Sequence, residues 1–202
     1  MRNSRPSHPA LSASRAKEYQ RCPLQFRLHV VDRIKEPPTQ ATLLGTTVHS
    51  ALENLYAAPR MQRDEALAQS LLEREWKTTL EQDPTVMSLF TDHADFERWY
   101  ARMRSMISNY FQIEEPRALE PHSREALVEG TTQDGVHLLG YIDRVDRAPN
   151  GDLRVIDYKT GKAPSDSKKR LSSKCVSTRF FSASLSVYLN VPSSFTSPRK
   201  RS

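Results

Sequence analysis

The chain has 202 residues, a formal net charge of +6 and a mean hydropathy of −0.65, values that suit one folded domain with its own hydrophobic core. No apolar run approaches the roughly 18 residues that a membrane span needs, and the first residues lack the apolar segment of a secretory signal. Its two cysteines, Cys22 and Cys175, cannot build a disulfide framework. We therefore expect a cytoplasmic protein that has no membrane partner.

The positive charge is concentrated toward the C-terminal end. Residues 165–202 contain eight lysines and arginines, one acid, twelve serines and no glycine, whereas residues 1–164 carry a net charge of −1. The composition therefore changes abruptly near residue 165. We predict three segments: a disordered N-terminus at residues 1–10, a folded domain at residues 11–164, and a disordered, basic, serine-rich tail at residues 165–202.

Two short helices are predicted near the start of the chain. Residues 11–22 form the first, with Ser12 or Ser14 as its N-cap, because a serine side chain accepts a hydrogen bond from the first helical turn. Pro23 suits the first position of the second helix. The proline pair at residues 37–38 ends this region.

Three longer helices follow, and each carries apolar side chains at helical spacing. Thr46 or Thr47 is predicted to cap the first of them, Asp64 opens the second, and the third runs from about residue 93 to residue 113. We expect the aromatic side chains of these helices to pack in the core rather than to bind a ligand.

The hydrophobic period changes from helical to strand-like after residue 122. Predicted strands occupy residues 125–129, 136–147 and 153–159, and turn-forming pairs at residues 134–135 and 150–151 separate them. The fold class that follows is α/β, with a helical N-terminal half and then a three-stranded antiparallel meander.

The register of the last hairpin decides which acidic side chains share a face. A two-residue turn at residues 150–151 would send Asp143 and Asp157 to opposite faces. A three-residue loop that includes Pro149 places Asp143 directly opposite Asp157. We prefer the three-residue loop, because Pro149 cannot donate a ladder hydrogen bond beside a two-residue turn.

Two acidic residues placed directly across a ladder have their Cβ atoms about 5 Å apart, and their carboxylates repel each other. A divalent cation removes this penalty, and oxygen ligands suit Mg²⁺ or Mn²⁺. Lys159 lies two residues after Asp157 and shares its face, where it can steer a nucleophile. The alternative is that Asp143 and Asp146 are merely solvated strand acids that pair with neighbouring arginines.

Two further residues could bind a metal ion. His49 lies on a predicted helix, and imidazole is a competent ligand for Mn²⁺. A single histidine at such a place usually only makes hydrogen bonds. Cys22 is a lone cysteine, which usually behaves as a small buried apolar side chain.

Four segments in this order resemble the PD-(D/E)xK nuclease superfamily, in particular its RecB-type exonuclease domain. They are Leu11–Phe26 (LSASRAKEYQRCPLQF), Gly45–Glu53 (GTTVHSALE), Gly140–Asp146 (GYIDRVD) and Ile156–Gly161 (IDYKTG). The resemblance implies a restriction-endonuclease-like core whose meander carries a metal site. It covers residues 11–164 as a partial nuclease domain.

The resemblance also implies roles for individual residues. His49, Asp143 and Asp157 correspond to the metal ligands, with the backbone carbonyl of Tyr158 as a fourth, and Lys159 corresponds to the catalytic lysine. The implied activity is that of a Mg²⁺- or Mn²⁺-dependent DNA exonuclease that hydrolyses phosphodiester bonds in repair or recombination. Its implied partners are single-stranded DNA or duplex ends and a separate helicase, because this chain has no phosphate-binding loop.

The first block of the resemblance implies contacts with DNA and a second cofactor. Ser14, Arg15, Tyr19 and Arg21 correspond to residues near the path of the single strand. Cys22 corresponds to the first of four cysteines that hold a 4Fe–4S cluster in many of these proteins. The other three are missing here, so the cluster is expected only in a full-length version and not in this chain.

The sequence departs from the family after Gly161. A helix with a Gln-x-x-x-Tyr pattern normally follows, but a shifted reading frame over residues 173–180 can spell Gln-Met-Arg-Phe-Tyr-Ala-Leu. Our hypothesis is that a frameshift near residues 164–168 made the tail non-native and removed the later strands and the covering helix. The alternatives to an active nuclease are an inactive truncated remnant and a non-catalytic nucleic-acid-binding module that uses the basic tail.

Overall fold

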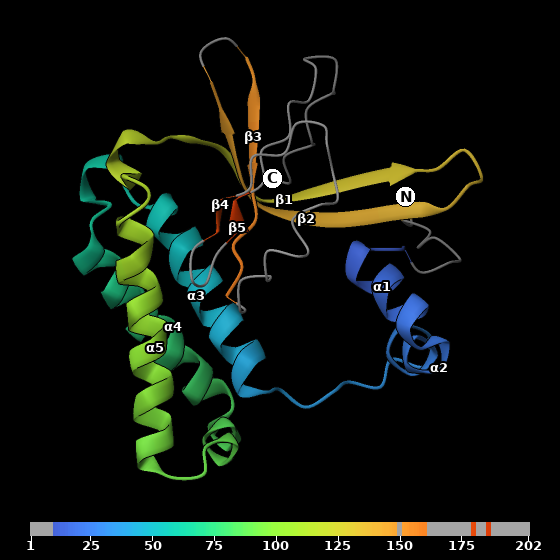
Figure 1. Cartoon of the computed structure of the whole chain (residues 1–202), viewed down its shortest axis with the longest axis horizontal. Helices are drawn as coiled ribbons and strands as arrows, with labels where there is room; N and C mark the ends of the chain where they lie inside the picture. Colours follow the sequence, from blue (N-terminus) through green and yellow to red (C-terminus); the bar gives the residue numbers. More distant parts are fainter. Residues whose placement is uncertain (1–9, 149–150, 161–178, 181–184, 187–202) are drawn as a thin grey trace, which may run out of the picture. The chain divides into compact units, whose positions relative to one another are not determined.

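The computed structural model describes residues 10–148, 151–160, 179–180 and 185–186 (Figure 1). Within them the chain forms two compact units. The first unit contains residues 10–37 and 126–141, and the second contains residues 38–125, 142–160 and the last two pairs. Across the described residues, every helix is too short or too polar to cross a lipid bilayer.

The first unit begins with the two predicted short helices. Helix α1 spans Ala13–Arg21, and its N-cap is Ser12, whose hydroxyl accepts a hydrogen bond from the backbone N–H of Arg15. Helix α2 spans Pro23–Phe26 and has its proline at the first position, as predicted. A single π-helical turn, Arg27–Val31, follows. The structure therefore selects Ser12 over Ser14 as the cap.

Helix α3 begins earlier than the sequence analysis predicted. It spans Gln40–Ala57, and Thr39 is its N-cap. The side chains of Thr39 and Thr42 each accept a hydrogen bond from the other's backbone N–H, which closes a capping box. The prediction of a cap at Thr46 or Thr47 is wrong, because both lie inside the helix and the Thr47 hydroxyl donates back to the preceding turn.

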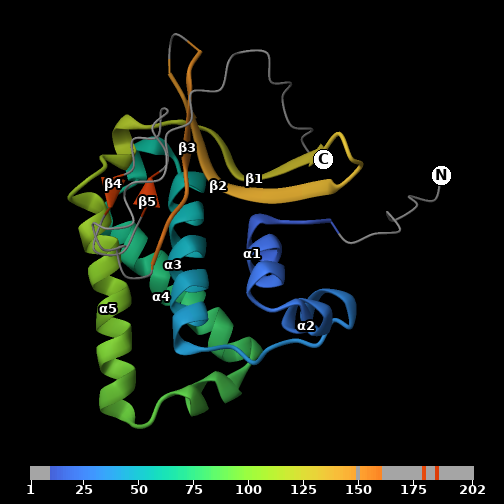
Figure 2. The ribbon, with the colours of Figure 1, turned by 45° about the vertical axis from the view of Figure 1, so that its right-hand side comes forward.

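Helices α4 (Glu65–Gln82) and α5 (His93–Phe111) pack beside α3 in both views (Figures 1 and 2). Asp64 caps α4, as predicted, and its carboxylate accepts the N–H of Leu67. The aromatic side chains of these helices are buried or pack, partly buried, against the core, which confirms their assignment to it. Buried members of this core include Leu52, Leu55, Tyr56, Leu72, Trp76, Phe90, Trp99, Met103, Ile107 and Tyr110.

The three predicted strands form one sheet in the order β1-β2-β3, with β1 at Pro121–Thr131, β2 at His137–Arg147 and β3 at Leu153–Ile156. Strands β2 and β3 are antiparallel, and their ladder runs from Arg147 opposite Leu153 to Arg144 opposite Ile156. This is the register of the three-residue loop, so that prediction is confirmed. Gly151 has a φ of 93°, which fits its place at the end of that loop.

Strand β3 is shorter than predicted. It ends at Ile156, and beyond it Asp157 forms only an isolated bridge. The N–H of Tyr158 donates to the side chain of Asp143 instead of to a ladder carbonyl. A side chain therefore replaces the backbone partner where the strand stops.

The tail prediction lies almost wholly outside the described residues. Only β4 (Arg179–Phe180) and β5 (Leu185–Ser186) are described there, and they pair antiparallel. Cys175 and residues 1–9 also lie outside the described part. The predicted disorder of both ends and the frameshift therefore stay predictions.

The capping box gives a direct test of where α3 begins. Thr39→Ala should lower the free energy of unfolding by about 1 kcal/mol, because it removes the acceptor for an N-terminal N–H. Thr46→Ala is the matched control, and it should change that free energy by less than about 0.5 kcal/mol. Urea denaturation followed by circular dichroism measures both, and a larger loss for Thr46→Ala would contradict the cap assignment.

Candidate metal centre

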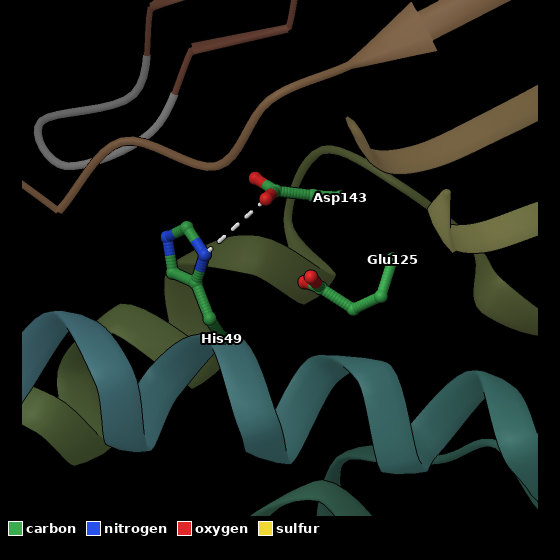
Figure 3. Close-up of side chains that lie close together, drawn as sticks. All are labelled: His49, Glu125 and Asp143. Carbon is green, nitrogen blue, oxygen red and sulfur yellow. Dashed lines mark ion pairs between the residues drawn. The ribbon is translucent and has the colours of Figure 1, made fainter. Parts of the chain in front are cut away.

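Three side chains of the second unit converge on one point: His49 of α3, Glu125 of β1 and Asp143 of β2 (Figure 3). Each offers a ligand atom, and these three atoms lie within 4.8 Å of one another. The Nδ1 atom of His49 is 3.5 Å from Oδ1 of Asp143. The cluster therefore presents one imidazole nitrogen and two carboxylate oxygens.

Local structure explains why His49 and Asp143 face this point. Val48, Leu52 and Leu55 form the buried stripe of α3, so the helix presents His49 at the edge of that stripe. Side chains alternate along a strand, and the next residue of β2, Arg144, is 1% exposed. Burial of Arg144 therefore turns Asp143 toward the opposite face.

Glu125 reaches the cluster through an unusual backbone conformation. Its φ is 42°, in the left-handed region that a residue with a Cβ seldom adopts. Such a conformation costs on the order of 1–3 kcal/mol and is found chiefly at functional sites. The sequence analysis missed Glu125, because it placed the residue at the start of a regular strand, and no glycine stands at or next to the distorted position.

The charges in the cluster act on one another. Burial opposes protonation of His49, but the hydrogen bond and charge of Asp143, with the backbone of Tyr158 and the charge of Asp157, outweigh burial and raise the pKa of the imidazole. The pKa of Glu125 is also raised, by burial first and then by the negative charges of Asp143 and Glu53. The site therefore favours added positive charge.

The donor set fits a hard divalent cation. Carboxylate oxygens are the preferred ligands of Mg²⁺, and an added imidazole suits Mn²⁺. Ligands on opposite sides of one such ion lie about 4.2 Å apart, close to the spread of the three atoms. His49, Glu125 and Asp143 could thus hold one ion with small side-chain adjustments.

Asp157 and Lys159 lie beside this cluster as an ion pair. The Nζ atom of Lys159 is 2.6 Å from Oδ2 of Asp157. Asp157 is not among the three converging ligands, although its charge contributes to the raised pKa of His49. Between these two residues, Tyr158 places its ring edge-to-face against the imidazole of His49, with 5.8 Å between ring centroids.

A shallow groove continues from the cluster along α3. One helix face contributes Thr42, Gly45, Thr46, His49, Ser50 and Glu53, and Glu125 lines the same groove. At Gly45 a Cβ atom would come within 3.2 Å of the hydroxyl of Thr160. Glycine therefore leaves room for the segment that carries Asp157 and Lys159 to approach the helix.

Asp146 pairs with the neighbouring Arg144, as the alternative predicted, but it is buried rather than solvated. It is 9% exposed, and its carboxylate accepts hydrogen bonds from Arg144 and Arg154. Asp143 pairs with no arginine among the described residues; it contacts His49 and accepts the N–H of Tyr158. The two acids of this motif therefore have different environments, one in the core and one in the cluster.

The residues predicted to contact DNA all lie in the first unit. Arg15 donates to the carbonyl of Ala10, and Arg21 donates to the side chain of Gln25. Tyr19 is 54% exposed, and the hydroxyl of Ser14 is 2.9 Å from that of Ser12. Cys22 is a free cysteine between α1 and α2.

Comparison with known proteins gives two matches. The profile of the PD-(D/E)XK nuclease superfamily matches residues 10–189. The Gene 69 protein of Mycobacterium phage D29 is 27% identical over 176 residues, which cover 78% of this chain and 65% of that protein. The chain thus spans about two thirds of the length of this relative.

The cluster predicts a specific pattern of metal binding. Asp143→Asn and Glu125→Gln should each weaken Mn²⁺ binding at least about 10-fold, because each removes one charged ligand. Isothermal titration calorimetry measures the affinity. Glu129→Gln, an exposed residue later in β1, is the matched control and should bind Mn²⁺ as the wild type does.

Thermal melting separates loss of a ligand from loss of the fold. Without metal, Glu125→Gln should melt no lower than the wild type, since it removes a carboxylate from a cluster of negative charge. Mn²⁺ at about 100 times its Kd should stabilise the wild type by about 2.7 kcal/mol. If Mn²⁺ stabilised the Glu125→Gln and Asp143→Asn variants as much as it stabilises the wild type, the assignment would be contradicted.

Proposed function

The chain belongs to the PD-(D/E)XK nuclease superfamily. From this premise we propose that it is a metal-dependent DNA nuclease. Its proposed active site is the cluster of His49, Glu125 and Asp143. The observation that carries the proposal is that His49 and Asp143, far apart in the sequence, converge beside the ion pair of Asp157 and Lys159. Acidic ligands can hold a cation that polarises a phosphoryl oxygen and acidifies water, and a neighbouring lysine can stabilise the negative charge that develops on the phosphate.

In this proposal the chain's own residues hold and orient the reacting groups. His49, Glu125 and Asp143 bind Mg²⁺ or Mn²⁺, and Asp157 with the backbone carbonyl of Tyr158 completes the ligand set. The bound cation supplies Lewis-acid chemistry, which polarises the phosphoryl oxygen and acidifies water. The β2–β3 ladder ends at the pair Arg144 and Ile156, so Asp143 and Asp157 are the residues directly beyond its last pair, one on each chain segment.

Lys159 is the proposed catalytic lysine. Its side chain is 57% exposed, so the ammonium can reach a bound substrate. Asp157 holds that ammonium at 2.6 Å and restricts its position. A lysine ammonium donates hydrogen bonds only, so Lys159 orients the attacking water through its oxygen and stabilises the negative charge that develops on the phosphate.

The first unit supplies the proposed DNA contacts. The Arg15 and Arg21 side chains donate to neutral oxygens, and neither pairs with a carboxylate among the described residues. Their charges are therefore free to neutralise phosphates. Tyr19 exposes an aromatic face on which a base can stack, and Ser14 lies in the same helix.

The finer proposal is a RecB-type exonuclease that degrades single strands or duplex ends in repair or recombination, in the cytoplasm and beside a separate helicase. Its support is the order of the four motif segments, three of which contain residues of the proposed site. No 4Fe–4S cluster is proposed for this chain, since such a cluster needs four cysteine ligands and the sequence contains two cysteines.

A nuclease assay tests the proposal. With Mg²⁺, the wild type should release nucleotides from labelled single-stranded DNA, and EDTA should abolish the release. Lys159→Ala should lower the rate at least about 100-fold, because it removes a donor to the transition-state charge. Lys77→Ala on α4 is the matched control, an exposed lysine outside the site, and should cleave as the wild type does.

The other outcomes decide between the alternatives. Salt-sensitive DNA binding without cleavage would favour the binding module, and neither binding nor cleavage would favour the inactive remnant. Circular single-stranded DNA separates exonuclease from endonuclease. An exonuclease leaves the circle intact and degrades the same sequence once it is linear, so cleavage of the circle would contradict the finer proposal.

The DNA contacts have a separate test in the salt dependence of binding. Arg21→Gln should weaken binding of single-stranded DNA and lower the slope of log K against log salt by about 0.7, the value for one phosphate contact. Arg27→Gln is the matched control, because Arg27 already pairs with Asp32 at 3.6 Å. Fluorescence anisotropy at several salt concentrations measures both slopes, and equal slopes for the two variants would remove Arg21 from the interface.

A further inference from the structure

We propose that Tyr158 is the positioning residue of the metal centre: its side chain and backbone N–H connect the ligands to a buried arginine, Arg144. This inference rests on the proposed function in that it takes the cluster of His49, Glu125 and Asp143 as a metal site. Tyr158 itself is 6% exposed and lies under the cluster rather than in the path of a substrate.

Tyr158 makes three contacts through three different groups. Its hydroxyl accepts a hydrogen bond of 2.9 Å from Nη1 of Arg144. Its ring meets the imidazole of His49 edge-to-face at 5.8 Å. Its backbone N–H donates to Oδ2 of Asp143 at 2.5 Å. Tyr158 therefore contacts two of the three side chains of the cluster, His49 and Asp143, and links both to Arg144.

Arg144 is a firm anchor for the tyrosine. It is 1% exposed, and its guanidinium donates to the carboxylates of Glu114 and Asp146 and to the hydroxyl of Tyr110. The ring of Tyr56 lies 4.5 Å from the guanidinium carbon. A buried charge with this many partners cannot shift without leaving several of them unpaired, and that cost holds it in place.

Strand alternation explains why the anchor and the ligands are coupled. Asp143 precedes Arg144, and Asp157 precedes Tyr158. In each pair the acid points to the site and the second residue points to the core. Arg144 donates a hydrogen bond to Tyr158. The positions of the two preceding acids, Asp143 and Asp157, therefore depend on that hydrogen bond.

The position of the segment after β3 depends on Tyr158 more than the positions of the strands do. The β2–β3 ladder ends at the pair Arg144 and Ile156. From Tyr158 to Thr160 the chain is outside any strand. The side chain and N–H of Tyr158 therefore replace the ladder as the support of Lys159.

Two tyrosine-to-phenylalanine variants separate positioning from stability. Tyr158→Phe and Tyr56→Phe each delete one hydroxyl from the same buried network and keep the ring. Tyr56 is 3% exposed, and its hydroxyl bonds to that of Tyr110 at 2.6 Å. Tyr56 lies on α3, and its hydroxyl bonds to Tyr110 rather than to the described residues of the segment that carries Asp157 and Lys159.

We expect the two variants to lose similar amounts of thermal stability but to differ at the site. Tyr158→Phe should weaken Mn²⁺ binding about 10-fold in calorimetry. In the metal-free protein it should also speed hydrogen exchange of the amides of residues 157–160. Tyr56→Phe should leave both properties as in the wild type.

Equal changes in Mn²⁺ affinity for the two variants, or a Tyr158→Phe affinity equal to that of the wild type, would overturn the proposal. If melting shows that Tyr158→Phe does not fold, Arg144→Lys takes its place. It keeps the buried charge but lacks the planar fork that reaches the tyrosine hydroxyl, and unchanged Mn²⁺ affinity in this variant would overturn the proposal.

Mn²⁺ binding and DNA cleavage by the wild type distinguish failure of the Tyr158 proposal from failure of the proposed function. A wild type that binds Mn²⁺ but does not cut DNA would refute the nuclease function, and the comparison of affinities would still decide the role of Tyr158. A wild type that binds no Mn²⁺ would refute both.

Discussion

The buried guanidinium of Arg144 is the interaction on which the second unit depends. It joins β2 to the end of α5 through Glu114 and Tyr110, and Arg154 of β3 shares the carboxylates of Glu114 and Asp146. Removing one partner from such a buried group typically costs 3–5 kcal/mol. Residues 142–147 of β2 and strand β3 are therefore held against the helices of the second unit, and the site residues next to them are held with them.

The candidate metal centre uses this fixed position rather than a loop of its own. Asp143 adjoins Arg144, so the strand that buries the arginine also aims the acid. The cluster gathers carboxylates that repel one another, and Glu125 joins it at the expense of a left-handed backbone. Repulsion and strain in one small region are typical of a site that is completed by a ligand. The imidazole of His49 and the N–H of Tyr158 offset part of the repulsion until then.

Much of this architecture could be predicted from local patterns. The amphipathic stripes of α3, α4 and α5 could be read because burial requires apolar side chains every three or four residues. The hairpin register followed from a proline and a glycine in the loop, since each restricts the backbone in its own way. From that register, alternation alone placed Asp143 across from Asp157. Four short motifs in order then identified the superfamily that the profile match confirms over residues 10–189.

Three features differ from the sequence analysis: the cap of α3 is a local capping box, whereas the other two depend on contacts between residues that are distant in the sequence. The cap of α3 went to Thr39 because its reciprocal bonds with Thr42 were available, although Thr46 and Thr47 are equally good caps by composition. Asp146 became a buried partner of two arginines, and Asp143, three residues earlier, became a candidate ligand. Glu125 entered the cluster through a backbone at positive φ, which the regular alternation of a strand does not predict. The sequence by itself determined most of the elements and the hairpin register, because these follow from short-range periodicity and turn chemistry, and the resemblance of four short motifs indicated the family. Only the tertiary structure decided which carboxylates meet, because that depends on which neighbours are buried beside them.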